Sequence, residues 1–198
     1  MPTTAEPPPP RARPGRRRSE ESRRAILGAA LDLVGEGGFA GLTVEGVAAR
    51  AGVGKQTIYR WWPSKADVLL DALVEEAELR VPAGDHGGYA ADLRAFLGDT
   101  FRLGSRPWVA EVLRALMAHA QVDPAFGERF RDSFLRARRD ALRRIVERAR
   151  ERGDLPPRPA PDTVLDLVFG VLWYRILATR EPLDEALVGE LLSVLVRS

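Results

Sequence analysis

The sequence predicts an all-α protein of about nine helices, with an N-terminal three-helix domain followed by a larger C-terminal helical domain. Apolar residues recur at spacings of three and four along most of the chain, which is typical of helices that bury one face. Glycine and proline clusters divide the chain into segments of helical length, and no stretch alternates as a strand does. With 198 residues, of which 45% are hydrophobic, the chain is long enough to bury a substantial core.

The N-terminal residues 1–18 are rich in proline and arginine and lack any period, so we expect a disordered basic arm. Such an arm can lie along phosphates or in a minor groove, or remain a solvated tail without a role, and the composition leaves both open. Ser19 is expected to cap the first helix, with Glu20 at its positive end. We expect the glycine-rich residues 35–41 to end that helix.

Residues 43–62 have the pattern of a helix-turn-helix. A short first helix is indicated by the apolar face of Val44, Val47, Ala48 and Ala51, and Gly52-Val53 supplies the turn. The second helix has only Ile58 and Trp62 as apolar anchors. Its other side chains suit phosphates and base edges better than a core; they are Lys55, Gln56, Thr57, Tyr59, Arg60 and Trp61.

The charge distribution supports a nucleic-acid contact at this end of the chain. Residues 1–65 hold eleven basic and six acidic side chains, whereas residues 66–198 hold nineteen basic and twenty-two acidic ones. Contacts with phosphates dominate the affinity of proteins for DNA, so the basic part that contains the helix-turn-helix is the expected binding surface.

The same region resembles the TetR family of transcription regulators. The family's motif is matched in register by Lys55, Thr57, Ile58, Tyr59, Trp62, Pro63, Ser64 and Lys65, and Thr43 stands where the family opens its second helix. The resemblance covers roughly residues 19–66, which it implies to be the DNA-binding domain. It extends more loosely to residues 67–198, which it implies to be an effector-binding and dimerisation domain.

Within the expected DNA-binding surface, we assign different contacts to different side chains. Phosphate contact is assigned to Thr43, Tyr59 and Lys65, whereas base-edge contact is assigned to Gln56, Thr57 and Arg60, with Lys55 as a further candidate. Tyr59 and Trp61 have an alternative interpretation as partly buried packing residues.

Beyond the motif, the chain continues as a series of helices. Ser64 is expected to cap the first of them, with Asp67 completing a capping box, and this helix runs to about Leu79. After a Pro/Gly break at 81–88, five further helices are expected over 89–103, 107–120, 124–152, 162–180 and 184–197. The helix at 124–152 is rich in arginine, but acidic residues lie between the arginines, so we expect an ordinary solvated face opposite its buried phenylalanines.

The last two helices are expected to form a subunit interface. The helix at 162–180 is apolar almost all round, so it must be covered on more than one side. The final helix adds an apolar stripe that includes Leu191 and Leu195. We expect both to pair with their copies in a homodimer, as TetR-like proteins do, and the dimer to recognise a pseudo-palindromic operator in double-stranded DNA.

Several other classes of protein are excluded. The chain has no cysteine, so thiol nucleophiles, disulfides and cysteine metal sites are absent. His86 and His119 lack ligand-spaced partners, and Gly52 to Lys55 lack the spacing of a phosphate loop, so we expect no metal, no cofactor and no enzymatic activity. No apolar run is long enough to cross a membrane and no signal peptide is evident, so the expected location is the cytoplasm.

The leading hypothesis is therefore a homodimeric repressor that a small apolar or aromatic effector releases from its operator. The resemblance and a concentration of bulky aromatic side chains place the effector among the central helices. The candidate lining is Phe96, Trp108, Leu116, Met117, Phe130, Phe134, Trp173 and Tyr174, with His119 and Arg175 as polar anchors. Ordinary core packing is the alternative for each of them. The alternative function is a TetR-like scaffold that mainly sequesters a small molecule or a partner protein.

Overall fold

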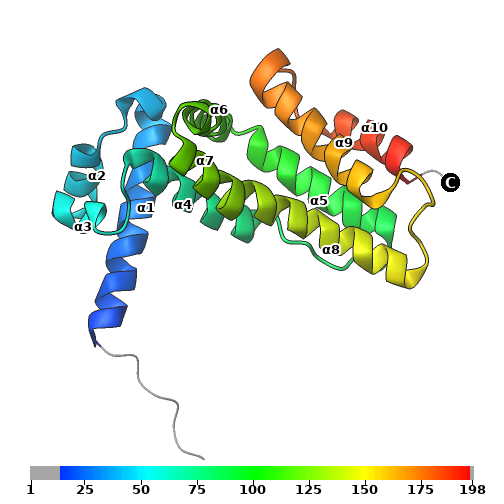
Figure 1. Ribbon diagram of the computed structural model, residues 1–198, viewed down its shortest axis with the longest axis horizontal. Coiled ribbons are helices and arrows are strands. Elements are labelled where there is room, and N and C mark those ends of the chain that lie inside the picture. Colours follow the sequence, from blue (N-terminus) through cyan, green and yellow to red (C-terminus); the bar gives the residue numbers. More distant parts are fainter. Residues whose placement is uncertain (1–13, 197–198) are drawn as a thin grey trace, which may run out of the picture.

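The computed structural model describes the backbone of residues 14–196 and the side chains of residues 19–196. All regular elements in this range are helical, which confirms the predicted fold class (Figure 1). They are α1 (Pro14–Gly41), α2 (Val44–Ala51), α3 (Lys55–Tyr59), α4 (Lys65–Arg80), α5 (Tyr89–Gly104), α6 (Pro107–Val122), α7 (Pro124–Phe130), a π-helical turn η1 (Arg131–Leu135), α8 (Arg136–Arg152), α9 (Pro161–Tyr174), a second π-helical turn η2 (Arg175–Thr179) and α10 (Glu185–Leu195).

The first helix is longer than the sequence predicts. Residues 1–13 of the expected arm lie outside the described residues, but α1 begins at Pro14, so the boundary expected at residue 18 and the cap expected at Ser19 are wrong. The fixed φ of proline suits the first position of a helix, which favours a start at Pro14. The glycine-rich segment kinks the helix at Gly38, whose φ is 68°.

The helix-turn-helix forms where the sequence predicts it. The Thr43 hydroxyl caps α2 by accepting a hydrogen bond from the Gly46 amide (3.0 Å), and α2 ends at Gly52, whose φ of 67° is left-handed. Ile58 and Trp62 are buried, as expected of its anchors. The indole of Trp62 donates to Asp71 on α4 (Nε1–Oδ2 2.9 Å), which ties the end of the helix-turn-helix to α4.

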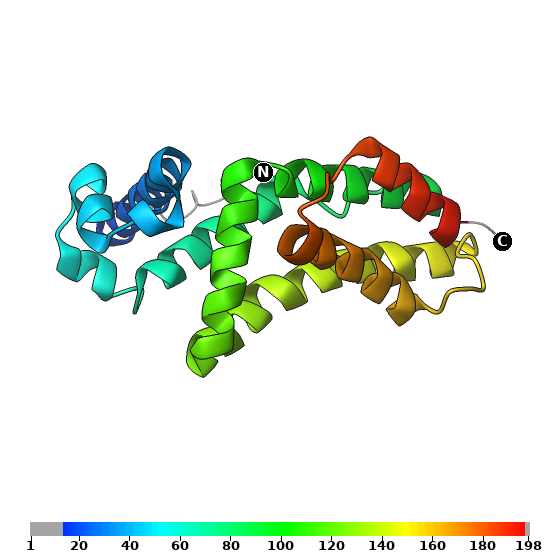
Figure 2. The ribbon, with the colours of Figure 1, turned by 90° about the horizontal axis from the view of Figure 1, so that it is seen from above.

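The C-terminal domain is built around one long helix. Elements α7, η1 and α8 follow one another without interruption over residues 124–152, and they carry the stacked rings of Phe126, Phe130 and Phe134. This long helix and α9 lie side by side, α5 packs against α8, and α10 covers α5 (Figure 2). The predicted helices at 89–103, 107–120 and 124–152 agree with the structure to within two residues.

Helices α4 and α6 join the two domains. Figures 1 and 2 show α1, α2 and α3 at one end of the molecule and α5, α8, α9 and α10 at the other, with α6 crossing between them. Helix α4 contacts α1, α5 and α6, and α6 contacts α1 as well. A change in the C-terminal domain can therefore reach the N-terminal domain through either helix.

A buried carboxylate holds the connection between α4 and α5. Asp92 is 1% exposed and accepts hydrogen bonds from the His86 amide (2.5 Å), Arg148 (3.1 Å) and Arg152 (2.8 Å). Burial opposes its ionisation, but the hydrogen bonds from Arg152, the His86 amide and Arg148 hold the pKa of Asp92 below its usual value. The Pro/Gly break at 81–88 is thereby fixed against α8.

Candidate functional site

Helix α3 of the helix-turn-helix presents polar side chains to solvent. Lys55, Gln56, Tyr59 and Arg60 are exposed on α3, and Thr57 is half-buried. Lys55 is engaged within the domain, because its Nζ lies 3.0 Å from Glu45 Oε1 on α2. This hydrogen bond lowers the pKa of Glu45. A phosphate would have to compete with that carboxylate for the Lys55 ammonium.

The aromatic residues of this surface lie in two different environments. The Tyr59 side chain is 55% exposed, so it does not serve as a packing residue in this structure. Trp61 is half-buried and packs against Trp62, with ring centroids 5.3 Å apart. The Arg60 guanidinium lies 5.8 Å from the centre of the Trp61 ring, a geometry that restrains the arginine at the end of the helix.

Lys65 lies at the start of α4 and binds backbone carbonyl groups. Its Nζ donates to Leu42 O at 2.8 Å and to Phe39 O at 3.4 Å, and it lies 4.7 Å from the centre of the Phe39 ring. The ammonium therefore holds the connection between α1 and α2. Thr43, the other residue assigned to phosphate outside α3, is exposed at the start of α2.

Two polar contacts fasten helices α6 and α7 to the N-terminal domain, which contains the helix-turn-helix. Glu111 on α6 accepts a hydrogen bond from the Phe39 amide (2.9 Å), directly after the kink at Gly38. Arg129 on α7 donates to Asp67 Oδ1 (2.7 Å), and the other oxygen of this buried carboxylate accepts a hydrogen bond from the Ser64 hydroxyl (2.7 Å). The first contact ends at Phe39, whose carbonyl also accepts from Lys65, and the second ends two residues after Lys65.

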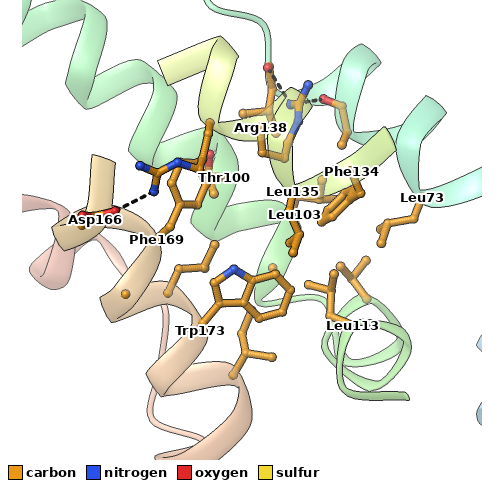
Figure 3. A pocket seen from close by; sticks show the side chains of 18 residues that line it. Leu73, Thr100, Leu103, Leu113, Phe134, Leu135, Arg138, Asp166, Phe169 and Trp173 are labelled. Atoms are coloured by element: carbon orange, nitrogen blue, oxygen red, sulfur yellow. Dashed lines mark hydrogen bonds and ion pairs between the residues drawn. The ribbon is translucent and has the colours of Figure 1, made fainter. Parts of the chain in front are cut away.

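The C-terminal domain contains a partly open apolar cavity of about 310 Å³. Its walls come from α4, α5, α6, η1, α8, α9 and η2, and they consist of Leu73, Ala77, Val81, Thr100, Leu103, Gly104, Val109, Leu113, Phe134, Leu135, Arg138, Arg139, Asp166, Phe169, Gly170, Leu172, Trp173 and Ile176. In Figure 3, Trp173, Leu113 and Phe134 lie around one side of the space, and Thr100, Arg138 and Asp166 lie toward the other. The cavity is therefore apolar with one polar edge.

The structure brings only two of the ten candidate effector residues to this cavity, Phe134 and Trp173. Phe96, Leu116 and Phe130 are buried elsewhere in the core, and the Phe130 ring packs edge-on against Trp173. Trp108 lies in a shallow groove beside α1 and α4, Met117 is partly buried against the core, and His119 packs on the Phe126 ring. Tyr174 is 62% exposed, and Arg175 binds Pro182 O and Glu181 outside the cavity.

Several cavity residues were not among the sequence-based candidates. Leu73 and Ala77 belong to α4, and a choice made from aromatic residues passes over them. Thr100 and Arg138 carry no signal in the sequence that distinguishes them from other helical residues. Asp166 is the exception, because an acidic residue that interrupts the apolar run of 164–174 indicates a local polar environment.

The apolar stripe of the last helix lies inside the subunit. Leu191 is 8% exposed and Leu195 is 1% exposed, because α10 turns this face onto α5, so their expected place at a subunit interface is wrong. The large apolar side chains left exposed at this end of the molecule are Leu167, Tyr174, Leu177 and Val194. The first three lie on the outer side of α9 and η2.

Residues 14–196 contain neither a membrane-spanning helix nor a cluster of metal ligands. No helix in this range has the length and apolar character needed to cross a membrane. No group of three or more His, Asp or Glu side chains in the same range gathers as metal ligands.

Comparison with known proteins agrees with this arrangement. Residues 26–72 match the bacterial regulatory proteins of the tetR family, and residues 83–195 match the tetracyclin repressor-like C-terminal domain. The HTH-type transcriptional regulator YdeS of Bacillus subtilis is 34% identical and covers 89% of each chain. The DNA-binding transcriptional repressor TetR of Mycobacteroides abscessus is 29% identical over 91% of this chain and 96% of its own.

Among solved structures, the TetR family transcription regulator SCO0332 has a TM-score of 0.77 and 32% identity, over 87% of this chain and 95% of that one. The helix-turn-helix, the matched residue ranges and the similarity along nearly the whole chain lead to one conclusion. The protein belongs to the TetR family of DNA-binding transcription regulators and is not an enzyme.

Proposed function

We propose that this protein is a homodimeric repressor whose α3 helices read a pseudo-palindromic operator and whose C-terminal cavity binds a small apolar effector. The observation that carries the DNA-binding part is the set of exposed polar side chains on α3, above the buried anchors Ile58 and Trp62. Gln56 and Arg60 have the amide and guanidinium groups that pair with adenine and guanine edges.

The residues of the head divide into two roles in this proposal. Gln56, Thr57 and Arg60 specify bases, while Thr43 and Tyr59 bind phosphates and set the orientation of the helix. Lys55 adds a phosphate or base contact when it leaves Glu45, which lies only 3.0 Å away.

Selection of bound duplexes from a random pool tests this proposal. We expect a pseudo-palindrome with two half-sites about one helical turn, or a multiple of it, apart. Arg60→Ala should weaken binding to the selected duplex by about 1–3 kcal/mol and relax the preference at one base pair of each half-site. Arg94→Ala is the matched control, since Arg94 is an exposed arginine on α5 that pairs with Glu185. Binding without any sequence preference would instead favour a scaffold that sequesters a ligand or partner.

The dimer is proposed from the exposed apolar residues of α9, η2 and α10. Leu167, Tyr174, Leu177 and Val194 are 38–62% exposed in the single chain, and exposed apolar side chains on the last elements of the chain are candidates for a protein interface. Pairing this face with its copy gives a two-fold axis, which two half-sites in the operator require.

The release mechanism follows from the walls of the cavity. Leu73 and Ala77 line it from α4 and Val81 lines it from the C-cap of that helix, whose first residue, Lys65, follows α3 by only a few positions. A ligand that fits better when α4 shifts favours a different spacing of the two reading helices. A 100-fold preference for that arrangement supplies about 2.7 kcal/mol, enough to lower operator affinity by the same factor.

The effector proposal is tested with a panel of hydrophobic compounds. Compounds that bind the protein are titrated with and without operator DNA, and linkage requires the same factor in both directions. Binders with equal affinity in the two titrations would contradict effector-induced release.

A further inference from the structure

The polar edge of the cavity contains one hydroxyl that no described residue satisfies. The Thr100 hydroxyl is fully buried and has no hydrogen-bond partner among the described residues. An unpaired buried hydroxyl costs about 1–3 kcal/mol, so a hydrogen-bonding group is missing beside it. The surrounding walls are formed largely by leucine, valine and aromatic side chains, which offer no partner.

The same edge carries an excess of positive charge. Arg139 is paired with Asp166 at the edge of the cavity (Nη1–Oδ1 2.8 Å), whereas no described carboxylate lies within ion-pair distance of Arg138. Arg138 uses only Nη1, which donates to the carbonyls of Ala77 (3.1 Å) and Val81 (3.3 Å). Two arginines against one aspartate leave one positive charge among the lining residues.

The two carbonyls only partly compensate this charge. Ala77 lies in the last turn of α4 and Val81 is its C-cap, so these carbonyls share the partial negative charge of a helix C-terminus, about half an elementary charge. Burial lowers the pKa of Arg138, and the more distant Glu78 and Arg144 act on it with opposite signs. The Nε and Nη2 donors of Arg138 have no partner among the described residues, so they are available to an acceptor.

Resting on the proposed effector site, we propose that the effector is a monoanionic amphiphile, a small molecule with one carboxylate on an apolar body. The apolar body lies among Phe134, Phe169 and Trp173, and the carboxylate lies at the edge formed by Thr100 and Arg138 (Figure 3). The cavity of about 310 Å³ has room for roughly ten groups the size of a water molecule, at about 30 Å³ each. A charge-assisted hydrogen bond from a partly buried arginine is about twice as strong as a neutral one, which favours an anion over an alcohol.

Three probes with equal chains and different head groups test this inference on the unmodified protein: decanoate, 1-decanol and decyltrimethylammonium. Calorimetric titration at pH 7.5, below the micelle concentrations, should show decanoate binding about tenfold more tightly than 1-decanol, a difference of about 1.4 kcal/mol. The cation should bind most weakly. An alcohol that binds as tightly as the acid, or no binding by any of the three, would overturn the proposal.

Variants then locate the head group. Arg138→Met keeps the length of the side chain and should remove the advantage of decanoate over 1-decanol, while Thr100→Val should weaken decanoate about threefold to tenfold, the loss of one hydrogen bond. Arg143→Met is the matched control, because Arg143 lies on the same helix, pairs with Asp162 and does not line the cavity. The ranking on the unmodified protein stands even where Arg138→Met folds poorly. Unchanged selectivity in a folded Arg138→Met protein would contradict the placement.

The outcome is separable from that of the proposed function, because the titrations contain no DNA. Tight decanoate binding without any effect on operator affinity would uphold the head-group inference and contradict effector-induced release. Release of the operator by 1-decanol but not by decanoate would uphold release and overturn the inference.

Discussion

Lys65→Met tests whether the Lys65 ammonium holds the head together. In the structure its Nζ donates to Leu42 O at 2.8 Å and lies 4.7 Å from the centre of the Phe39 ring. A hydrogen bond from a charged group contributes about 1.5 kcal/mol at the lower end of its range, which suits this half-buried position. The cation–π contact adds about 0.5 kcal/mol, so the variant should lose about 2 kcal/mol of unfolding free energy.

A loss of this size is measurable by thermal unfolding. For a protein of this length it corresponds to a fall of about 4–8 °C in Tm. Lys55→Met is the matched control, since Lys55 is the other lysine of the chain, is exposed and pairs only with Glu45. Its loss should change the Tm by no more than about 2 °C, because exposed ion pairs contribute little to stability.

The salt dependence of DNA binding separates this role from phosphate contact. A lysine that neutralises one phosphate contributes about 0.9 to the slope of log affinity against log salt. An unchanged Tm together with a reduced slope in Lys65→Met would refute the reasoning from its carbonyl contacts. A lower Tm with an unchanged slope would show that Lys65 only shapes the head.

Three further predictions follow from other contacts. Asp92→Asn should lower the unfolding free energy by about 2–3 kcal/mol at pH 7, because a carboxylate with a depressed pKa stabilises the fold above its unfolded pKa. This stabilisation is lost as the pH falls, so chemical unfolding at several pH values should show the difference between the two proteins vanishing at acid pH. Leu167→Glu places a charge in the proposed interface and should give monomers in sedimentation. Leu79→Glu, at an exposed site of α4, is the control and should leave the dimer intact. A dimeric Leu167→Glu protein would contradict the proposed interface. Arg129→Met should weaken the effect of a bound effector on operator affinity by several-fold, because it releases Asp67 from α7; an unchanged ratio in paired titrations would show that this contact transmits nothing.

The fold was largely predictable because local signals repeat along the chain. Caps such as Thr43 and Ser64 act through the next three residues, and glycine and proline mark the ends of helices, so the boundaries after residue 42 are close to those expected. The start of α1 was not predictable in the same way, because arginine favours helix as readily as it appears in a disordered arm. The buried anchors Ile58 and Trp62 were predictable from spacing alone.

The functional sites were predictable only in part, because tertiary packing decides them. Aromatic side chains indicate a core, but the sequence does not show which of them face a space, and of those chosen only Phe134 and Trp173 do. Leu191 and Leu195 show the same limit, since an apolar stripe does not reveal whether its partner is the same chain or a second subunit. The engagement of Lys65 with carbonyls depends on the kink of α1; the glycine-rich segment indicates a break there, but not which carbonyls it turns toward Lys65.

The most direct test of the central claim is the ratio of operator to scrambled-duplex affinity for the unmodified protein and for Gln56→Ala. The operator is the duplex selected from a random pool, and both affinities are measured at one fixed salt concentration. If α3 reads bases, the ratio is large for the unmodified protein and falls by about tenfold or more in the variant, while the affinity for scrambled DNA is unchanged. An equal ratio for the two proteins, with Arg60→Ala likewise without effect, would show that α3 does not read the operator.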